Sequence, residues 1–210
     1  MRVIRNFVAF EGGDGSGKST QLRLLSRIFS SRPELPPLHP TFEPTDGPVG
    51  RFIRSALRRE PPLQPETLAR LFAADRNEHL YGHDGILARI ERGELVVCDR
   101  YILSSLIYQG ITCGKDLPRE LNKSFPLPEA LVFFDLDPCL AVRRLGTRAE
   151  RDPYETVAFQ AQVREAYCAA LPGYAAAGVR VAVLDASAPE EEVAAALWRE
   201  MRKLPILGAW

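Results

Sequence analysis

A glycine-rich segment near the N-terminus constrains the fold of this chain more than any other feature. Residues 12–19 read Gly-Gly-Asp-Gly-Ser-Gly-Lys-Ser and fit the pattern G-x-x-x-x-G-K-[ST]. An apolar run at residues 6–11 precedes this segment, and helical spacing follows it, with Leu22 and Leu25 on one face. Strand, glycine loop and helix in this order predict a phosphate-binding loop. A glycine-rich turn that only joins two elements is the alternative.

The residue types in this segment suit triphosphate binding. Glycines let successive backbone N–H groups converge on phosphate oxygens, and the start of the following helix adds partial positive charge. Lys18 is expected to reach the β- and γ-phosphates, and the Ser19 hydroxyl is expected to bind Mg²⁺. We therefore predict a nucleoside triphosphate site. Its candidate residues are Gly12, Gly13, Asp14, Gly15, Ser16, Gly17, Lys18, Ser19 and Thr20.

The remaining apolar segments predict a parallel sheet. Residues 95–99, 130–136 and 179–184 read as buried strands because their apolar residues are continuous rather than alternating. A further strand is expected at 38–42, where flanking prolines weaken the pattern. Together they predict an α/β, three-layer P-loop NTPase fold, with about five parallel strands and helices on both faces. Helices are predicted at 47–59, 65–80, 81–92, 153–176 and 189–203, with Pro172-Gly173 kinking or ending the fourth.

Composition and charge exclude several classes of partner. Apolar residues make up 46% and charged residues 26% of the 210 residues, which is typical of one soluble domain spanning 1–210. Lys plus Arg equal Asp plus Glu at 27 each, so the net charge favours neither nucleic acid nor an anionic membrane as partner. No apolar run has membrane-spanning length, and the N-terminus lacks a secretory signal. We expect a cytoplasmic protein.

The strand at 95–99 runs directly into a second candidate site. Its last residue is Asp99, and Arg100 and Tyr101 follow. Ligands of such sheets bind beyond the carboxyl ends of the strands, which predicts that Asp99 and Arg100 lie beside the phosphate-binding loop. Asp99 is a candidate Mg²⁺ ligand and Arg100 a candidate phosphate ligand. An ordinary Asp–Arg pair that caps the next helix is the alternative.

Two further patterns suit nucleotide chemistry. Arg143, Arg144, Arg148 and Arg151 lie close together, which predicts either a mobile lid at about 143–153 that brings arginines to the phosphates or a solvated helix face. On the predicted helix at 65–80, Phe72 and Arg76 share a face and could bind a planar base. A core phenylalanine and a surface arginine are the alternative for that pair.

In this order and spacing, the four signals resemble the thymidylate kinase family over nearly the whole chain. Residues 10–20 resemble the opening strand and loop, 71–76 the base-binding helix, and 99–110 the Asp-Arg-Tyr motif with its helix. Many unrelated NTPases share the phosphate-binding loop, but the combination is specific. Gly15 stands where some members carry a loop arginine, so the arginines at 143–153 indicate the bacterial type with lid arginines.

The resemblance implies transfer of the γ-phosphate of ATP to dTMP, giving dTDP and ADP for dTTP synthesis, with Mg²⁺ and usually as a homodimer. It implies catalytic roles for Lys18, Asp99, Arg100 and Arg148, and metal ligation by Ser19 and Asp99. Besides the loop, Arg144 and Arg148 are implied to contact ATP. The implied acceptor-binding residues are Asp14, Pro44, Phe72, Arg76, Arg100, Ser105 and Tyr108.

One departure and two alternatives accompany the resemblance. Phe42 occupies a position where the bacterial type usually has an arginine, and Arg51 and Arg54 are the candidates to replace that guanidinium. The first alternative is another nucleoside or nucleotide kinase of the same fold, with a different acceptor. The second is a nucleotide-binding switch that transfers no phosphoryl group.

Overall fold

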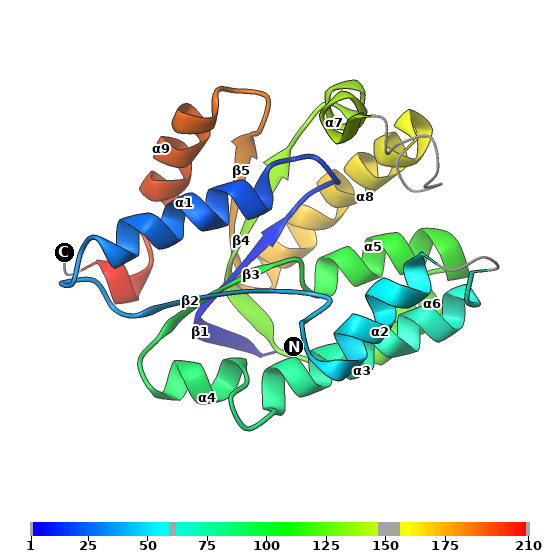
Figure 1. The fold of residues 1–210 in the computed structure, drawn as a ribbon, viewed down its shortest axis with the longest axis horizontal. Helices are drawn as coiled ribbons and strands as arrows, with labels where there is room; N and C mark the ends of the chain where they lie inside the picture. Colours follow the sequence, from blue (N-terminus) through cyan, green and yellow to red (C-terminus); the bar gives the residue numbers. More distant parts are fainter. Residues whose placement is uncertain (1, 59–61, 147–155, 209–210) are drawn as a thin grey trace.

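A parallel, five-stranded sheet forms the centre of the computed structural model, which describes residues 2–58, 62–146 and 156–208 (Figure 1). The strand order is β2-β3-β1-β4-β5, as expected for the predicted P-loop NTPase class. All four neighbouring pairs are parallel. The strands are β1 (Val3–Glu11), β2 (Leu38–Phe42), β3 (Leu95–Asp99), β4 (Leu127–Asp135) and β5 (Arg180–Asp185).

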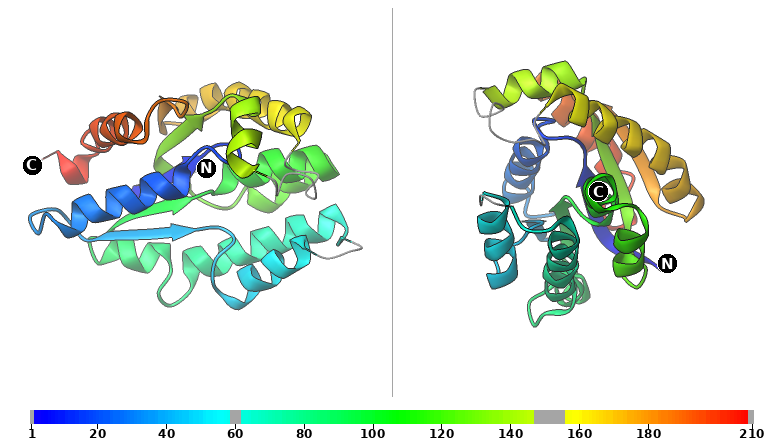
Figure 2. Two further views of the ribbon diagram at one scale, coloured as in Figure 1. Left: turned by 45° about the horizontal axis from the view of Figure 1, so that its top comes forward. Right: turned by 90° about the vertical axis from the view of Figure 1, so that its right-hand side faces the viewer.

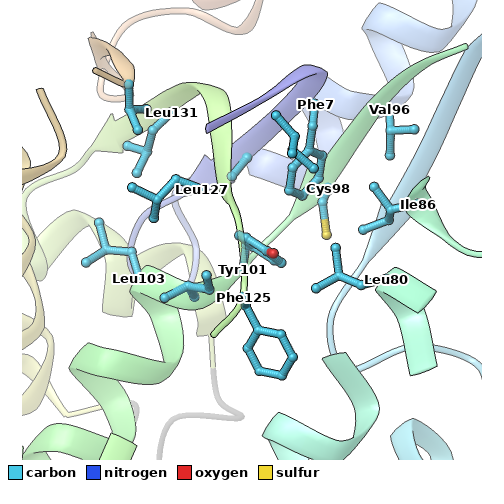
Figure 3. Packing of buried hydrophobic residues seen from close by; sticks show 14 of the residues in the cluster. Phe7, Leu80, Ile86, Val96, Cys98, Tyr101, Leu103, Phe125, Leu127 and Leu131 are labelled. Carbon is cyan, nitrogen blue, oxygen red and sulfur yellow. The ribbon is translucent and has the colours of Figure 1, made fainter. Parts of the chain in front are cut away.

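Helices cover both faces of this sheet, because the central strands are apolar on both sides. The helices are α1 (Lys18–Ser30), α2 (Pro48–Leu57), α3 (Pro65–Tyr81), α4 (Ile86–Glu91), α5 (Ile102–Cys113), α6 (Asp116–Asn122), α7 (Pro138–Leu145), α8 (Val157–Ala176) and α9 (Glu190–Met201), followed by a short 3₁₀ helix (Pro205–Leu207) (Figure 2). Val8 and Phe10 of β1 pack in one core cluster with residues of α1 and α9. Phe7 and Ala9 pack on the opposite face with residues of α3, α4, α5 and α8, in the cluster that Figure 3 shows.

One helix prediction was wrong in its bounds, and one of two alternatives for another helix was wrong. The helix predicted at 81–92 is only α4, Ile86–Glu91, because Gly82 and Gly85 form a tight turn in which a Cβ at Gly82 would lie 2.6 Å from the Glu78 carbonyl oxygen. Pro172 does not end α8, which continues to Ala176. Tertiary packing of Val163 and Tyr167 holds the helix against the core and overrides the local signal.

The register of the sheet brings three strand ends together. Phe10 of β1 pairs with Asp99 of β3, and Glu11 pairs with Phe133 of β4. Helices α2, α3, α5 and α6 gather beside these ends (Figure 1). Among the described helices, none combines the length and the apolar character needed to cross a membrane.

Candidate active site

The glycine-rich segment forms a tight loop between β1 and α1. Gly12, Gly15 and Gly17 have φ angles of 151°, 74° and 86°, which side chains rarely allow. A Cβ at Gly15 would also lie 2.8 Å from the carbonyl oxygen of Ala141 in α7. The loop therefore depends on glycine for its backbone conformation and for its close approach to α7.

Lys18 begins α1 and is buried under this loop, with 5% of its surface exposed. Its Nζ donates hydrogen bonds to the carbonyl oxygens of Gly12 (3.1 Å) and Gly13 (2.9 Å) and to the Ser16 hydroxyl (3.1 Å). Burial, together with the positive charge of Arg100, lowers the pKa of Lys18 from 10.5 to about 8. Among the described residues, no carboxylate forms an ion pair with it, so it presents its charge to the loop.

Ser19 and Asp99 lie together at the start of α1. The Ser19 hydroxyl donates a hydrogen bond of 2.6 Å to Asp99 Oδ2. The other carboxylate oxygen, Oδ1, is buried and has no hydrogen-bond partner among the described residues. A hydroxyl beside an unpartnered carboxylate oxygen offers the hard oxygen ligands that Mg²⁺ prefers, so these residues fit a magnesium ion.

Arg100 turns back from β3 toward the loop. Its φ angle is 70°, a left-handed conformation that costs energy for a residue with a side chain. The guanidinium donates to Asp14 Oδ1 (2.5 Å), to the Gly12 carbonyl oxygen (3.3 Å) and to the Ser104 hydroxyl (3.2 Å). Asp99 and Arg100 thus have separate partners in Ser19 and Asp14.

Asp14 joins the loop to two helices. Its Oδ2 accepts hydrogen bonds from the Tyr108 hydroxyl (3.1 Å) in α5 and from Gln160 (3.3 Å) in α8. Burial acts to raise the pKa of Asp14, but the positive charges of Arg100 and Lys18 outweigh it and hold that pKa below its usual value. Asp14 is therefore a carboxylate that orients Arg100 from the loop.

A cavity of about 230 Å³ opens next to Arg100. It lies among α2, α3 and α5, where Leu57, Leu68 and Thr112 add to its wall. Every residue that the resemblance assigned to the acceptor lines it: Asp14, Pro44, Phe72, Arg76, Arg100, Ser105 and Tyr108. Phe72 is half-buried and belongs to neither core cluster, unlike an ordinary core phenylalanine.

Arg76 is buried in the wall of this cavity, with 1% of its surface exposed. Its Nη2 donates to Glu43 Oε2 (2.6 Å) and to the Ser105 hydroxyl (3.0 Å), and its Nη1 donates to Asn122. Its Nε is buried and has no partner among the described residues. A surface arginine is thus the wrong interpretation, because this guanidinium is buried and held by Glu43, Ser105 and Asn122.

Glu43 also belongs to the one group of possible metal ligands found among the described residues, with His79 and Cys98. Their ligand atoms lie within 4.8 Å of one another, but Arg76 already neutralises Glu43. Burial raises the pKa of the Cys98 thiol well above its usual value, and the thiol donates to the Arg100 carbonyl oxygen (3.0 Å). Glu43, which His79 contacts at 3.1 Å, therefore supports Arg76, whereas Cys98 bonds to the backbone of Arg100.

The predicted lid is described only at its start. Arg143 and Arg144 lie in the last turn of α7, and Arg148 and Arg151 fall outside the described residues. Arg144 donates a hydrogen bond of 2.9 Å to the Ala186 carbonyl oxygen. It also lines a hollow of about 340 Å³ with Gly15, Gly17 and Thr20 of the loop.

Phe42 ends the edge strand β2 and is 41% exposed. The guanidinium of Arg54 lies over its ring, at 5.9 Å from the centroid. Arg54 also donates to the carbonyl oxygen of Pro44 (2.5 Å), which lines the cavity, whereas Arg51 donates to the Asp46 carbonyl oxygen (2.5 Å). Of the two candidates, Arg54 is therefore the one that packs against Phe42.

Sequence comparison agrees with this geometry. The sequence model of the family described as thymidylate kinase matches residues 10–197. The chain belongs to the thymidylate kinase family. Relatives include a putative thymidylate kinase of Treponema pallidum, 44% identical over 80% of this chain and 79% of the relative. A probable thymidylate kinase of Pyrobaculum aerophilum is 40% identical over 90% and 92%, and a thymidylate kinase of Leptospira borgpetersenii is 38% identical over 79% and 81%.

Three buried residues of the site were missed from the sequence. Glu11, Glu43 and Gln160 contact Ser104, Arg76 and Asp14 respectively. Glu11 ends β1 and Glu43 directly follows β2, so a charged residue at the carboxyl end of a strand was the available signal. The sequence carries no such signal for Gln160, because nothing in the local pattern of α8 distinguishes it.

Proposed function

We propose that this protein is a thymidylate kinase that transfers the γ-phosphate of ATP to dTMP, giving dTDP and ADP. The observation that carries the proposal is the position of Arg100. Its guanidinium contacts the loop at Gly12 and Asp14 and also lines the cavity of α2, α3 and α5. A cation between a phosphate-binding loop and a base-sized cavity suits a reaction in which two nucleotides meet through their phosphates.

The loop side of Arg100 is proposed to bind ATP. Backbone N–H groups of the glycine loop and Lys18 would hold the β- and γ-phosphates. Ser19 and Asp99 would hold Mg²⁺, whose charge offsets that of the phosphates when it is bound. Arg144 lies beside the hollow at Gly15 and Thr20, which supports a contact with ATP, and Arg148 is proposed to join it from the lid.

The cavity side is proposed to bind dTMP. Phe72 would stack on the base, and Arg76, which lines the same cavity, would donate to a base oxygen. Tyr108 and Asp14 would position the sugar, and Ser105, bonded to Arg76, would border the base. Arg100 would hold the acceptor phosphate facing the loop.

The chemistry requires alignment and neutralisation more than proton transfer. The acceptor phosphate is already an anion, so direct transfer needs no strong base and no covalent enzyme intermediate. Lys18 and Arg100 would reduce the repulsion between the two phosphates, and the lid arginines would stabilise charge on the transferring oxygens. Asp14 would keep Arg100 aimed at that point.

An acceptor screen with Mg·ATP tests the proposal. We expect dTMP to be phosphorylated far better than thymidine or UMP, with ADP measured in a coupled assay. Turnover of dUMP is expected to be weaker but detectable, because the apolar contact with the thymine methyl that it lacks is worth only about 1–3 kcal/mol. Preference for a nucleoside would identify another kinase of this fold, and ATP binding without transfer to any monophosphate would identify a switch.

A homodimer and a cytoplasmic location stay predictions. Light scattering of the purified protein tests the homodimer.

A further inference from the structure

Glu11, the last residue of β1, is a fully buried carboxyl group beside the glycine loop. Four donors face its two oxygens. Oε1 accepts from the backbone N–H groups of Tyr101 (3.0 Å) and Ser104 (3.2 Å), and Oε2 accepts from the hydroxyls of Ser104 (2.6 Å) and Tyr167 (2.9 Å). Since backbone N–H groups only donate, this environment requires an acceptor and suits a carboxylate.

The burial of this group is costly, so its contacts call for an explanation. Burial raises the pKa of Glu11, while the hydrogen bonds of Ser104 and Tyr167 and the charge of Arg100 act in the opposite direction. An apolar residue would avoid the burial of a carboxyl group, but it would leave the backbone N–H groups of Tyr101 and Ser104 without an acceptor. The four hydrogen bonds therefore indicate that a specific arrangement of the neighbouring chain is being held.

That arrangement is the start of α5. Tyr101 is its N-cap residue and provides no side-chain cap, and Ser104 lies in the first turn, where N–H groups lack partners within the helix. Glu11 supplies the missing acceptor from another element. It thus fixes the chain immediately after Arg100.

The other side of Arg100 is fixed by β1 as well. Its backbone N–H donates to the Phe10 carbonyl oxygen (2.8 Å). Its guanidinium reaches the Ser104 hydroxyl (3.2 Å), which itself donates to Glu11. Phe10 and Glu11 therefore hold Arg100 from both sides in a left-handed conformation that costs about 1–2 kcal/mol and persists only where neighbours impose it.

We propose that Glu11 is a positioning residue for Arg100: it imposes the left-handed backbone and, through Ser104, sets the direction of the guanidinium. The inference rests on the proposed function, in which Arg100 meets the acceptor phosphate. It predicts that Glu11 affects use of dTMP without affecting the binding of ATP.

The first test is E11Q, assayed with Mg·ATP and varied dTMP. Glutamine keeps the size and one oxygen for the two backbone N–H groups, but it places an NH₂ donor against the hydroxyls of Ser104 and Tyr167. We expect kcat/KM for dTMP to fall about tenfold or more, the effect of losing a charge-assisted hydrogen bond. The Kd of ATP, measured by calorimetry, should stay within about twofold of the wild-type value.

E129Q is a matched control. Glu129 of β4 accepts a hydrogen bond (2.8 Å) from the backbone N–H of Asn6. Asn6 has a φ of 61° and is the other non-glycine residue with a left-handed backbone in the described part of the chain. The same substitution there should leave kcat and both KM values unchanged, because Asn6 lies five residues before Glu11, the end of β1 that meets the loop.

A double-variant cycle with R100K separates positioning from general destabilisation. If Glu11 acts through Arg100, E11Q/R100K should lose little more kcat/KM than the worse single variant. If the two losses multiply, or if E11Q lowers only the urea midpoint, the proposal is overturned.

Should E11Q fail to fold, the variant S104A decides, because it keeps the Glu11 carboxylate and breaks its link to the Arg100 guanidinium. A fivefold or greater loss of kcat/KM for dTMP supports the proposal, and unchanged kinetics refute it.

Failure of this inference is distinguishable from failure of the proposed function. If the wild-type protein phosphorylates dTMP and both E11Q and S104A have the same kinetics as wild type, the proposed function stands and the positioning role of Glu11 is refuted. Wild-type protein that phosphorylates no monophosphate would overturn the function itself, and with it this role of Glu11.

Discussion

Replacing Lys18 by methionine removes a buried positive charge while nearly keeping the length of the side chain. In the folded protein the pKa of Lys18 is lowered from 10.5 to about 8 by burial, with a further contribution from Arg100. Between these two pH values the unfolded chain carries a proton on Lys18 that the folded chain does not. Stability therefore rises with pH across this window, and the cost of the charge is fully present below pH 8.

The magnitude follows from the same pKa values. Each tenfold change in proton affinity corresponds to about 1.4 kcal/mol, so the charged lysine costs the folded state about 3 kcal/mol. Between pH 7 and pH 9 about 1 kcal/mol of this cost is recovered. The full cost of about 3 kcal/mol is a large share of the roughly 5–15 kcal/mol by which a typical domain is stable.

Urea unfolding of wild type and K18M at pH 7, 8 and 9, without nucleotide or Mg²⁺, measures this recovery. The free energy of unfolding of wild type minus that of K18M should rise by about 1 kcal/mol from pH 7 to pH 9, because other titrating groups cancel in the difference. K123M is the control, since Lys123 is exposed and pairs only with Glu120 among the described residues. A difference for K18M that is flat or falls with pH would refute the reasoning.

Three further predictions concern the two ends of the site. R100A should lower kcat about 10³-fold or more while ATP affinity stays within about twofold, and normal turnover in a coupled ADP assay would remove Arg100 from the mechanism. F72A should weaken dTMP binding by about 1–3 kcal/mol, by analogy with stacking of bases on aromatic side chains; equal affinity in calorimetry would exclude stacking. E43Q should lower the free energy of unfolding by about 3 kcal/mol, because Arg76 keeps a buried charge without its partner, and an unchanged urea midpoint would contradict this.

Much of the fold could be predicted because its strands carry a strong local signal. The strands expected at 95–99 and 38–42 coincide with β3 and β2. The first is apolar throughout and the second lies at the edge of the sheet, where Pro40 does not interrupt a central ladder. The helix predicted at 81–92 begins only at Ile86, because the turn formed by Gly82 and Gly85 overrides the apolar spacing around it.

The site was less predictable, because its partners come from distant parts of the chain. Helical spacing placed Phe72 and Arg76 on one face. It could not reveal that Arg76 is buried and pairs with Glu43, which lies 33 residues away in the sequence. Likewise, Asp99 and Arg100 are adjacent in the sequence, but their partners Ser19 and Asp14 are about 80 residues away. Only the pairing of β1 with β3 brings these residues together. Long-range pairing of polar groups is a property of the fold rather than of any local pattern.

The charges of the site divide it into two chemically different ends. At the cavity wall Arg76 pairs with Glu43, so that end carries a neutral pair and suits an uncharged base with hydrogen-bonding oxygens. At the loop Lys18 bonds only to carbonyl and hydroxyl oxygens among the described residues. The charges of Asp99, Asp14 and Glu11 balance it only in part, since burial still lowers its pKa. Arg100 stands between them, balanced by Asp14. Because an incompletely balanced buried cation destabilises the empty site and an anion relieves that cost, we expect the phosphates rather than the base to supply the larger electrostatic share of the binding free energy.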